Sequence, residues 1–76
     1  MTLHIDIKKE IDGYTAVVPT IKGCEAWSDE YEVALNKIIN LIAYYLKLEK
    51  NFKYRLDITL NSPELVSYTI NIYKPY

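Results

Sequence analysis

DEYEVALNKIINLIAYYLKLEK, residues 29–50, decides the fold, because its apolar side chains recur at helical spacing and predict one amphipathic helix. Asp29 is expected to cap this helix while Glu32 reaches back to the cap amide, and both carboxylates suit the positive end of the helix dipole. Asn51 is expected to end the helix in a left-handed conformation. The predicted helix has about five turns.

The segments on either side of the helix have a different period, in which apolar and polar residues alternate as in a strand with one buried face. Gly13 and Gly23 lie where the chain must turn between the first three segments, and residues 61–64 supply a turn between the last two. The expected strands are residues 3–8, 14–18, 24–27, 53–60 and 66–72.

This order of elements predicts a single α+β domain over residues 1–76, arranged β-β-β-α-β-β, with one helix packed on a mostly antiparallel sheet. A right-handed crossover through the helix would bring the fourth strand beside the first strand and parallel to it. The expected strand order is therefore 3-2-1-4-5, with the third and fifth strands at the edges.

Two apolar stripes run along the predicted helix. One stripe is sufficient to dock the helix on the sheet: Ala34, Ile38, Leu41, Tyr45 and Leu48. The second stripe widens the apolar arc along one flank: Leu35, Ile39, Ile42 and Leu46. Either the twisted sheet wraps this flank, or another chain covers it, since an uncovered apolar patch of that size is an association site.

Trp27 and Tyr73 are the other candidates for contact with a partner or a second copy. By alternation with Cys24 and Ala26, Trp27 falls on the sheet face away from the helix, and Tyr73 has the same parity in the last strand. Exposed aromatic side chains are enriched at interfaces, although packing over neighbours at the sheet rim is the alternative. Two free edges and the helix flank together predict a homo-oligomer, either a dimer or a tetramer.

The composition restricts the class of protein. Nine basic and ten acidic residues give a net charge of -1, so direct binding to DNA is not expected. Cys24 is the single cysteine, which excludes an internal disulfide and predicts a small buried hydrophobe. The chain has no apolar run long enough to cross a bilayer, so no membrane association is expected. A cytoplasmic protein is the expectation.

No residue is predicted to perform catalysis or to hold a metal or cofactor. His4 and Cys24 are single representatives of their types, which is too few for a catalytic triad or a zinc site. Asp6 and Asp57 are expected on the polar face of the sheet, where solvated charge is the ordinary state of a carboxylate. The sequence therefore favours a binding protein over an enzyme.

An ordered set of short motifs covers the first part of the chain. They are Asp12-Gly13-Tyr14, Val18-Pro19, Ile21-Lys22-Gly23-Cys24, Ser28-Asp29-Glu30 and Glu32-Val33-Ala34-Leu35. Over roughly the first 45 residues this set resembles the signature of the HicB antitoxin family. Lys22, Ser28 and Val33 stand where that family usually has proline, glycine and glutamate, so a divergent member is expected.

The resemblance implies a partial ribonuclease H-like fold without the nuclease, whose usual partner is a small HicA-type toxin that cleaves mRNA. Neutralisation would come from occluding the toxin. Many HicB relatives carry a C-terminal DNA-binding segment, whereas this sequence ends after a hairpin, so operator binding is not carried over. The alternative is a stand-alone oligomeric structural or assembly domain with no toxin partner. Nucleic-acid binding through Trp27 and Tyr73 is disfavoured by the net charge.

Overall fold

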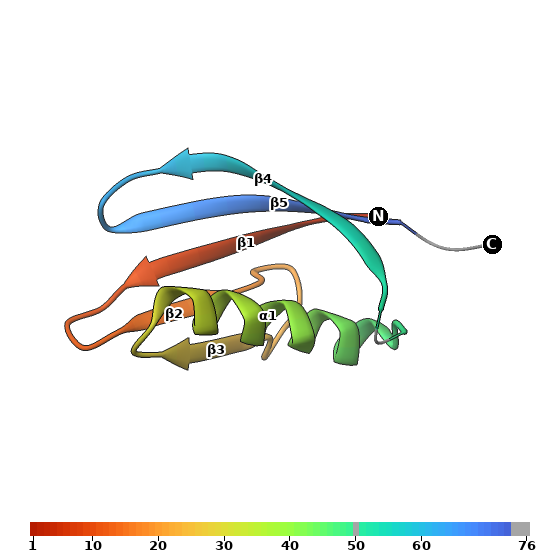
Figure 1. Cartoon of the computed structure of the whole chain (residues 1–76), viewed down its shortest axis with the longest axis horizontal. Coiled ribbons are helices and arrows are strands. Elements are labelled where there is room, and N and C mark those ends of the chain that lie inside the picture. The colour runs from red at the N-terminus through yellow and green to blue at the C-terminus, as the bar shows by residue number, and fades with distance from the viewer. Residues whose placement is uncertain (50, 74–76) are drawn as a thin grey trace.

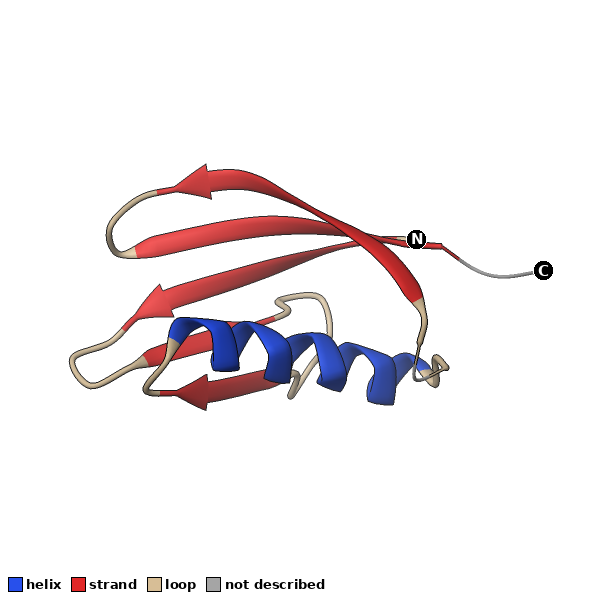
Figure 2. Cartoon of the chain, viewed as in Figure 1, coloured by secondary structure: helices blue, strands red, loops and turns tan. Residues whose placement is uncertain are grey.

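The structure, a computed structural model, describes residues 1–49 and 51–73 and has the expected order of elements. Figure 2 shows the helix lying across one face of the sheet. The prediction of an α+β fold with one helix on an antiparallel-rich sheet is confirmed. The elements are β1 (Thr2–Lys9), β2 (Tyr14–Val17), β3 (Glu25–Ser28), α1 (Tyr31–Leu46), β4 (Lys53–Asn61) and β5 (Leu65–Tyr73).

The strand order is β3-β2-β1-β5-β4, and every neighbouring pair is antiparallel. The expected order 3-2-1-4-5 is therefore wrong, and so is the expected parallel pairing of the first and fourth strands. β5 lies between β1 and β4, as Figure 1 shows. The edges of the sheet are β3 and β4, where the third and fifth strands were predicted.

The side chains on the sheet face away from the helix explain why β5 is the inner strand of the final hairpin. β4 presents charged residues on this face, which suit an edge strand, whereas β5 presents uncharged ones. An antiparallel pairing of β5 with β1 is also slightly more stable per residue than a parallel pairing of β4 with β1. The residues concerned are Lys53, Arg55 and Asp57 on β4, and Ser67, Thr69 and Asn71 on β5.

The helix begins later than the sequence predicted. Its N-cap is Glu30, which makes no side-chain cap bond, so the expected capping box of Asp29 and Glu32 does not form. The buried hydroxyl of Ser28 instead accepts a hydrogen bond from the Glu30 N–H at 3.2 Å. The last residue of β3 therefore also organises the start of α1, in place of a cap at Asp29.

The helix also ends earlier than predicted. Lys47 is the C-cap and takes a left-handed conformation (φ 54°), a role that had been expected of Asn51. The Lys47 and Leu48 N–H groups donate to the carbonyls of Tyr44 and Ala43, which closes the final turn. No helix in residues 1–49 or 51–73 is long and apolar enough to cross a membrane.

The core lies between α1 and the sheet and is dominated by isoleucine. Ile5 and Ile7 of β1, Ile38 and Ile42 of α1, and Ile70 of β5 are each at most 1% exposed. β-branched side chains suit strands, and two of them placed one helical turn apart give α1 a continuous apolar ridge. Burial of these side chains is the main force that holds the helix on the sheet.

The flank of α1 that was expected to be covered either by the sheet or by another chain is covered by the sheet. Leu35, Ile39 and Ile42 are 9%, 5% and 0% exposed and belong to the core, and Leu46 is half-buried against it. Leu35, Ile39 and Ile42 are thus occupied within one copy, whereas Leu46 keeps part of its surface exposed, and contact of this flank with a partner stays a prediction. The physical reason for the burial is that side chains of the sheet and of α1 pack into one apolar cluster, which includes this flank.

The stripe that was expected to dock the helix is buried only in part. Ala34 and Ile38 are fully buried, whereas Leu41 is half-buried and Tyr45 is 42% exposed. The Tyr45 hydroxyl donates a hydrogen bond to the Gly23 carbonyl at 3.2 Å, beyond the edge of the core. The buried face of α1 is therefore rotated toward the Leu35 flank relative to the prediction.

The sheet has a covered half and an open half. α1 packs on β3, β2 and β1, and in the described part of the chain its backbone does not approach β4 or β5. The open half is joined to the helix through Tyr31 and Tyr68, whose hydroxyls share a hydrogen bond. Tyr14 packs edge-on against Tyr31, with ring centroids 5.5 Å apart, and so extends this link into the covered half.

Candidate functional site: an acidic end with two exposed apolar side chains

Three connections meet at one end of the molecule: the β1–β2 turn, the step from β3 into α1, and the β4–β5 turn (Figure 1). The Lys9 N–H donates to the Glu64 carbonyl at 2.9 Å and fastens the first of these turns to the third. Residues from distant parts of the sequence thus share one surface, which we call the acidic end. Its composition and shape make it the best candidate for a functional site.

The carboxylates of this end outnumber its cations. Lys8 and Lys9 at the end of β1 are the basic residues of these segments. The exposed acidic residues are Asp12 in the β1–β2 turn, Asp29, Glu30 and Glu32 around the start of α1, and Glu64 in the β4–β5 turn. Although the net charge of the chain is only -1, its negative charge is concentrated here. A concentrated negative field favours a basic partner.

Ile11 stands at the tip of the β1–β2 turn and is fully exposed, at 107% of its reference area. The turn is closed by the Glu10 N–H, which donates to the Gly13 carbonyl at 2.7 Å, so the tip is held in place. An isoleucine in this position contributes nothing to the core of its own chain. Sequence reasoning missed Ile11, because it treated residues 10–13 only as a turn. The signal was a large apolar residue between two carboxylates.

Trp27 lies beside the same turn and is 47% exposed. It pairs with Thr15 on β2, and its neighbour Ala26 faces the helix, so the prediction that Trp27 lies on the sheet face away from α1 is confirmed. The indole covers Gly13: a Cβ atom built there would lie 2.7 Å from Trp27 Cζ2 and 2.5 Å from the Ser28 carbonyl oxygen. Only glycine fits beneath this ring, because it has no Cβ atom. The ring therefore packs directly on the β1–β2 turn and forms one wall of the acidic end.

Tyr73, the other exposed aromatic predicted to make contacts, is 51% exposed but lies elsewhere. It is the last described residue of β5 and pairs with Lys53 at the start of β4, far from the acidic end. β2 and β1 separate the strand of Trp27 from that of Tyr73. The two aromatics therefore do not form a common surface.

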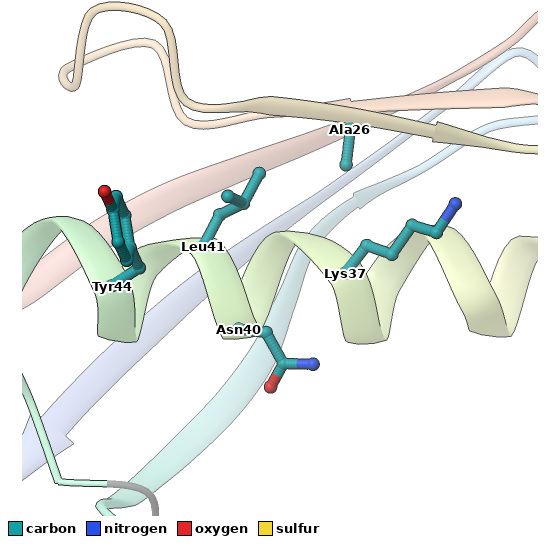
Figure 3. A pocket seen from close by; sticks show the side chains of 5 residues that line it. All are labelled: Ala26, Lys37, Asn40, Leu41 and Tyr44. Atoms are coloured by element: carbon teal, nitrogen blue, oxygen red, sulfur yellow. The ribbon is translucent and has the colours of Figure 1, made fainter.

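A groove of about 390 Å³ runs between α1 and β3 and is lined by Ala26, Lys37, Asn40, Leu41 and Tyr44. Figure 3 shows Leu41 and Lys37 directed toward β3, and Asn40 directed away from it. Lys37 Nζ donates to the Trp27 carbonyl oxygen at 3.0 Å and so bridges the helix to the edge strand. The groove is open and offers an apolar floor without a nucleophile or an acid–base pair.

The residues considered for catalysis lie apart. Cys24 is 2% exposed, as predicted for a small buried hydrophobe, and burial raises the pKa of its thiol. His4 is exposed on the sheet face away from the helix, opposite Thr69. Asp6 accepts a hydrogen bond from the Ser67 hydroxyl at 2.7 Å, and Asp57 pairs with Arg55 at 3.1 Å. Among the described residues, no three His, Cys, Asp or Glu side chains are grouped so as to hold a metal ion.

The fold and this surface define a class: a small α+β protein with two exposed apolar side chains among the carboxylates at one end. Over 46 residues, or 60% of its length, the chain is 41% identical to a UPF0150 protein of Helicobacter pylori (strain J99 / ATCC 700824). The similarity spans 64% of that protein, which is less than two thirds of its length. No family model matches the chain, and no solved structure gives a significant match.

Proposed function

We propose that this protein is a HicB-like antitoxin-type binding module that neutralises a small HicA-type mRNA-cleaving toxin by occluding it, acting in the cytoplasm by binding and without catalysis. The observation that carries the proposal is that the HicB-like signature folds into one continuous unit, from the β1–β2 turn to the start of α1. The similarity to the UPF0150 protein over 46 residues is consistent with this resemblance.

Each glycine of the signature has a structural task in that unit. Gly13 is buried beneath Trp27, where no Cβ fits, and Gly23 takes a left-handed conformation with φ 82° just before the buried Cys24. Ser28, a departure from the family pattern, is buried and accepts the Glu30 N–H. The signature thus specifies a scaffold, and any binding activity depends on the side chains that this scaffold presents.

The acidic end is the surface we assign to the toxin. Ile11 and Trp27 supply the apolar anchors that a protein interface needs near its centre, and exposed carboxylates such as Asp12 and Asp29 surround them. A toxin that binds RNA needs a basic surface, because it must contact phosphates. An acidic antitoxin surface would complement that basic surface and compete with the RNA for it.

Coexpression provides the test. The chain is produced together with the product of any short gene beside its own that encodes a basic protein, and rescue of growth and copurification are measured. Ile11→Ser and Asp12→Lys are expected to weaken rescue, and neither side chain supports the fold, because both are exposed in a turn. Tyr73→Ala is the control, since Tyr73 is also an exposed apolar side chain, at 51%, but lies far from the acidic end.

Full rescue by Ile11→Ser and Asp12→Lys, together with loss of rescue by Tyr73→Ala, would move the toxin surface to the other end. Failure of the wild-type chain to bind or protect against any such neighbour would remove the antitoxin function. The alternative would then apply, that of a stand-alone oligomeric structural domain. The long exposed edge of β4 favours that alternative.

A further inference from the structure

β4 is a long edge strand whose protection consists of charged side chains on one face and a register irregularity between Ile58 and Leu60. It extends for nine residues, Lys53–Asn61, and only Leu56 among them is even half-buried. No hydrogen bond from a described side chain covers its outer edge. Its helix-side face carries the exposed Tyr54 and Ile58, at 40% and 56%. A strand with these properties is a template for pairing with another strand.

The opposite edge of the sheet is different. β3 has only four residues, and Lys37 Nζ already occupies the outward carbonyl of Trp27 at 3.0 Å. A short strand with a lysine across its edge is a common way to prevent sheet-to-sheet association. β3 is thus better protected than β4 against pairing with another strand. The β4 edge is the one that is available for assembly.

The sequence of β4 is complementary to itself. If two copies run antiparallel about a two-fold axis at Leu56, Arg55 of each copy lies opposite Asp57 of the other. On the helix-side face, the same register places Tyr54 opposite Ile58 and one Leu56 opposite the other. Every charged pair is then of opposite sign, and the exposed apolar side chains lie against one another.

Neighbouring registers lack this complementarity. An axis at Arg55 places the two arginines directly opposite each other, and an axis at Asp57 does the same with the two aspartates, which is unfavourable in either case. An axis between two residues would place the apolar face of one copy beside the charged face of the other. The register of β4 with β5 becomes irregular between Ile58 and Leu60, so the regular part of the strand is centred near Leu56.

We infer that a second copy of this chain is the partner of β4, paired antiparallel about Leu56 so that the two sheets become continuous and both helices lie on the same face. Within one copy Arg55 Nε already lies 3.1 Å from Asp57 Oδ2, with side chains 64% and 50% exposed. Pairing brings two arginines and two aspartates together in alternation across the axis. This assembly uses a different surface from the acidic end, so it does not depend on the proposed function.

Charge reversal in β4 tests the register directly. Analytical ultracentrifugation of the full chain at increasing concentration is expected to show a dimer. Arg55→Asp alone puts four carboxylates at the axis, and Asp57→Arg alone puts four guanidinium groups there. Each variant is expected to weaken self-association at least about tenfold. The double variant Arg55→Asp/Asp57→Arg restores opposite signs and is expected to dimerise as the wild type does.

Mixing the two single variants is the most specific measurement. Arg55→Asp and Asp57→Arg are each expected to be monomeric, yet together they complement at both pairs and are expected to form a 1:1 heterodimer. Lys22→Glu, an exposed charge reversal outside β4, is the control and is expected to leave the dimer intact. Both β4 side chains are exposed, so circular dichroism is expected to show unchanged folding.

A cross-link provides a second readout that is independent of charge. Leu56→Cys places two thiols opposite each other at the axis and is expected to form a disulfide-linked dimer on mild oxidation, whereas Arg55→Cys is not, because two Arg55 positions are displaced along the strands. A wild-type monomer at high concentration, or single variants that still dimerise, or no heterodimer on mixing, would each overturn the inference. None of these results bears on toxin binding at the acidic end.

Discussion

The two halves of the sheet have similar alternating sequences but opposite surroundings. In the covered half, β1 and β2 contribute Ile5, Ile7 and Ala16, all at most 1% exposed beneath α1. In the open half, β4 has the same alternation, but Ile58 is 56% exposed and no helix lies over it. Alternation in sequence indicates a strand with one apolar face. It does not indicate whether the same chain supplies the cover.

The difference follows from the size of one helix. α1 has 16 residues, and helix axes pack about 8–10 Å from their neighbours, so a single helix covers two or three strands and not five. β5 still contributes Ile70 and Ile72 to the core, at 0% and 3% exposed, whereas β4 is stabilised mainly by its hydrogen bonds to β5. An open half of this kind is the part of the molecule where a second chain gains most by binding.

The largest effect is expected from truncating equivalent residues in the two halves. Ile38→Ala, in the covered half, is expected to lower the free energy of unfolding by about 2–5 kcal/mol, because the side chain is fully buried and leaves a cavity. Ile58→Ala, in the open half, is expected to cost less than about 1 kcal/mol. Urea unfolding, at a concentration where the chain is monomeric, measures both values. Equal costs would show that the open half is packed within one copy.

A smaller effect is expected from adding one methyl group within the covered half. Gly13→Ala forces the Ser28 carbonyl or the Trp27 ring to move, since the new Cβ would lie 2.5 Å and 2.7 Å from them, and is expected to cost about 1–3 kcal/mol. Gly23→Ala has room, with Tyr45 Oη 3.4 Å away, but its φ of 82° is expected to cost about 1–2 kcal/mol.

Removing the Trp27 ring distinguishes the two clashes that a Cβ atom at Gly13 would make, one with the ring and one with the Ser28 carbonyl. In the double variant Gly13→Ala/Trp27→Ala, the clash with the Ser28 carbonyl remains, so only part of the lost stability is expected to return. Thermal unfolding of the single and double variants measures this coupling. Full recovery would mean that the indole alone requires glycine at this position.

The covered half could be predicted from sequence in most respects. Alternation gave its three strands, helical spacing gave α1, and the placement of Trp27 away from the helix and of Cys24 in the core followed from parity and residue type. These features depend on local patterns that recur every two or every three to four residues. The helix ends were less predictable, because Ser28, from the preceding strand, replaced the expected cap.

The open half could not be predicted as well, for a physical reason. A hairpin can join a sheet through either of its strands, and both β4 and β5 carry one apolar face. The choice of β5 as the inner strand depends on pairing with β1, whose partner residues lie 57 to 69 positions away in sequence. The charges on Arg55 and Asp57 were the available signal for an edge strand. Likewise, the acidic end is formed by three turns that only the fold brings together.

The Tyr31–Tyr68 hydroxyl pair, which links the two halves, is expected to make the protein less stable at alkaline pH. Burial, with a further contribution from the Tyr68 hydrogen bond, raises the pKa of Tyr31 above its ordinary value. Because the tyrosine of the unfolded chain then ionises first, the contribution of Tyr31 to stability is expected to be constant below a pH of about 10 and to fall as the pH rises further. Tyr31→Phe is expected to cost about 0.5–1.5 kcal/mol at neutral pH through loss of the shared hydrogen bond.

Urea midpoints at neutral and alkaline pH measure this contribution. The decline of stability at high pH is expected to be shallower in Tyr31→Phe than in the wild type, although not abolished, because the raised pKa of Cys24 acts in the same direction. Tyr14→Phe is the control, since its ring packs against Tyr31 without taking part in the hydroxyl pair. An unchanged alkaline decline in Tyr31→Phe would show that the hydroxyl pair is not what links the halves.

The smallest effect on folding is expected at the β3 edge, where Lys37 bonds to the Trp27 carbonyl. Lys37→Ala removes an exposed hydrogen bond to the Trp27 carbonyl and is expected to change the free energy of unfolding by less than about 1 kcal/mol. The same substitution is expected to affect association, because it leaves the Trp27 carbonyl on the outer edge of β3 free to pair with another strand. In the Arg55→Asp background, where β4 no longer pairs, Lys37→Ala is expected to restore weak, concentration-dependent self-association, measured by light scattering. Lys22→Ala in the same background is the control. A double variant that stays monomeric would show that the four-residue length of β3 protects this edge without help from Lys37.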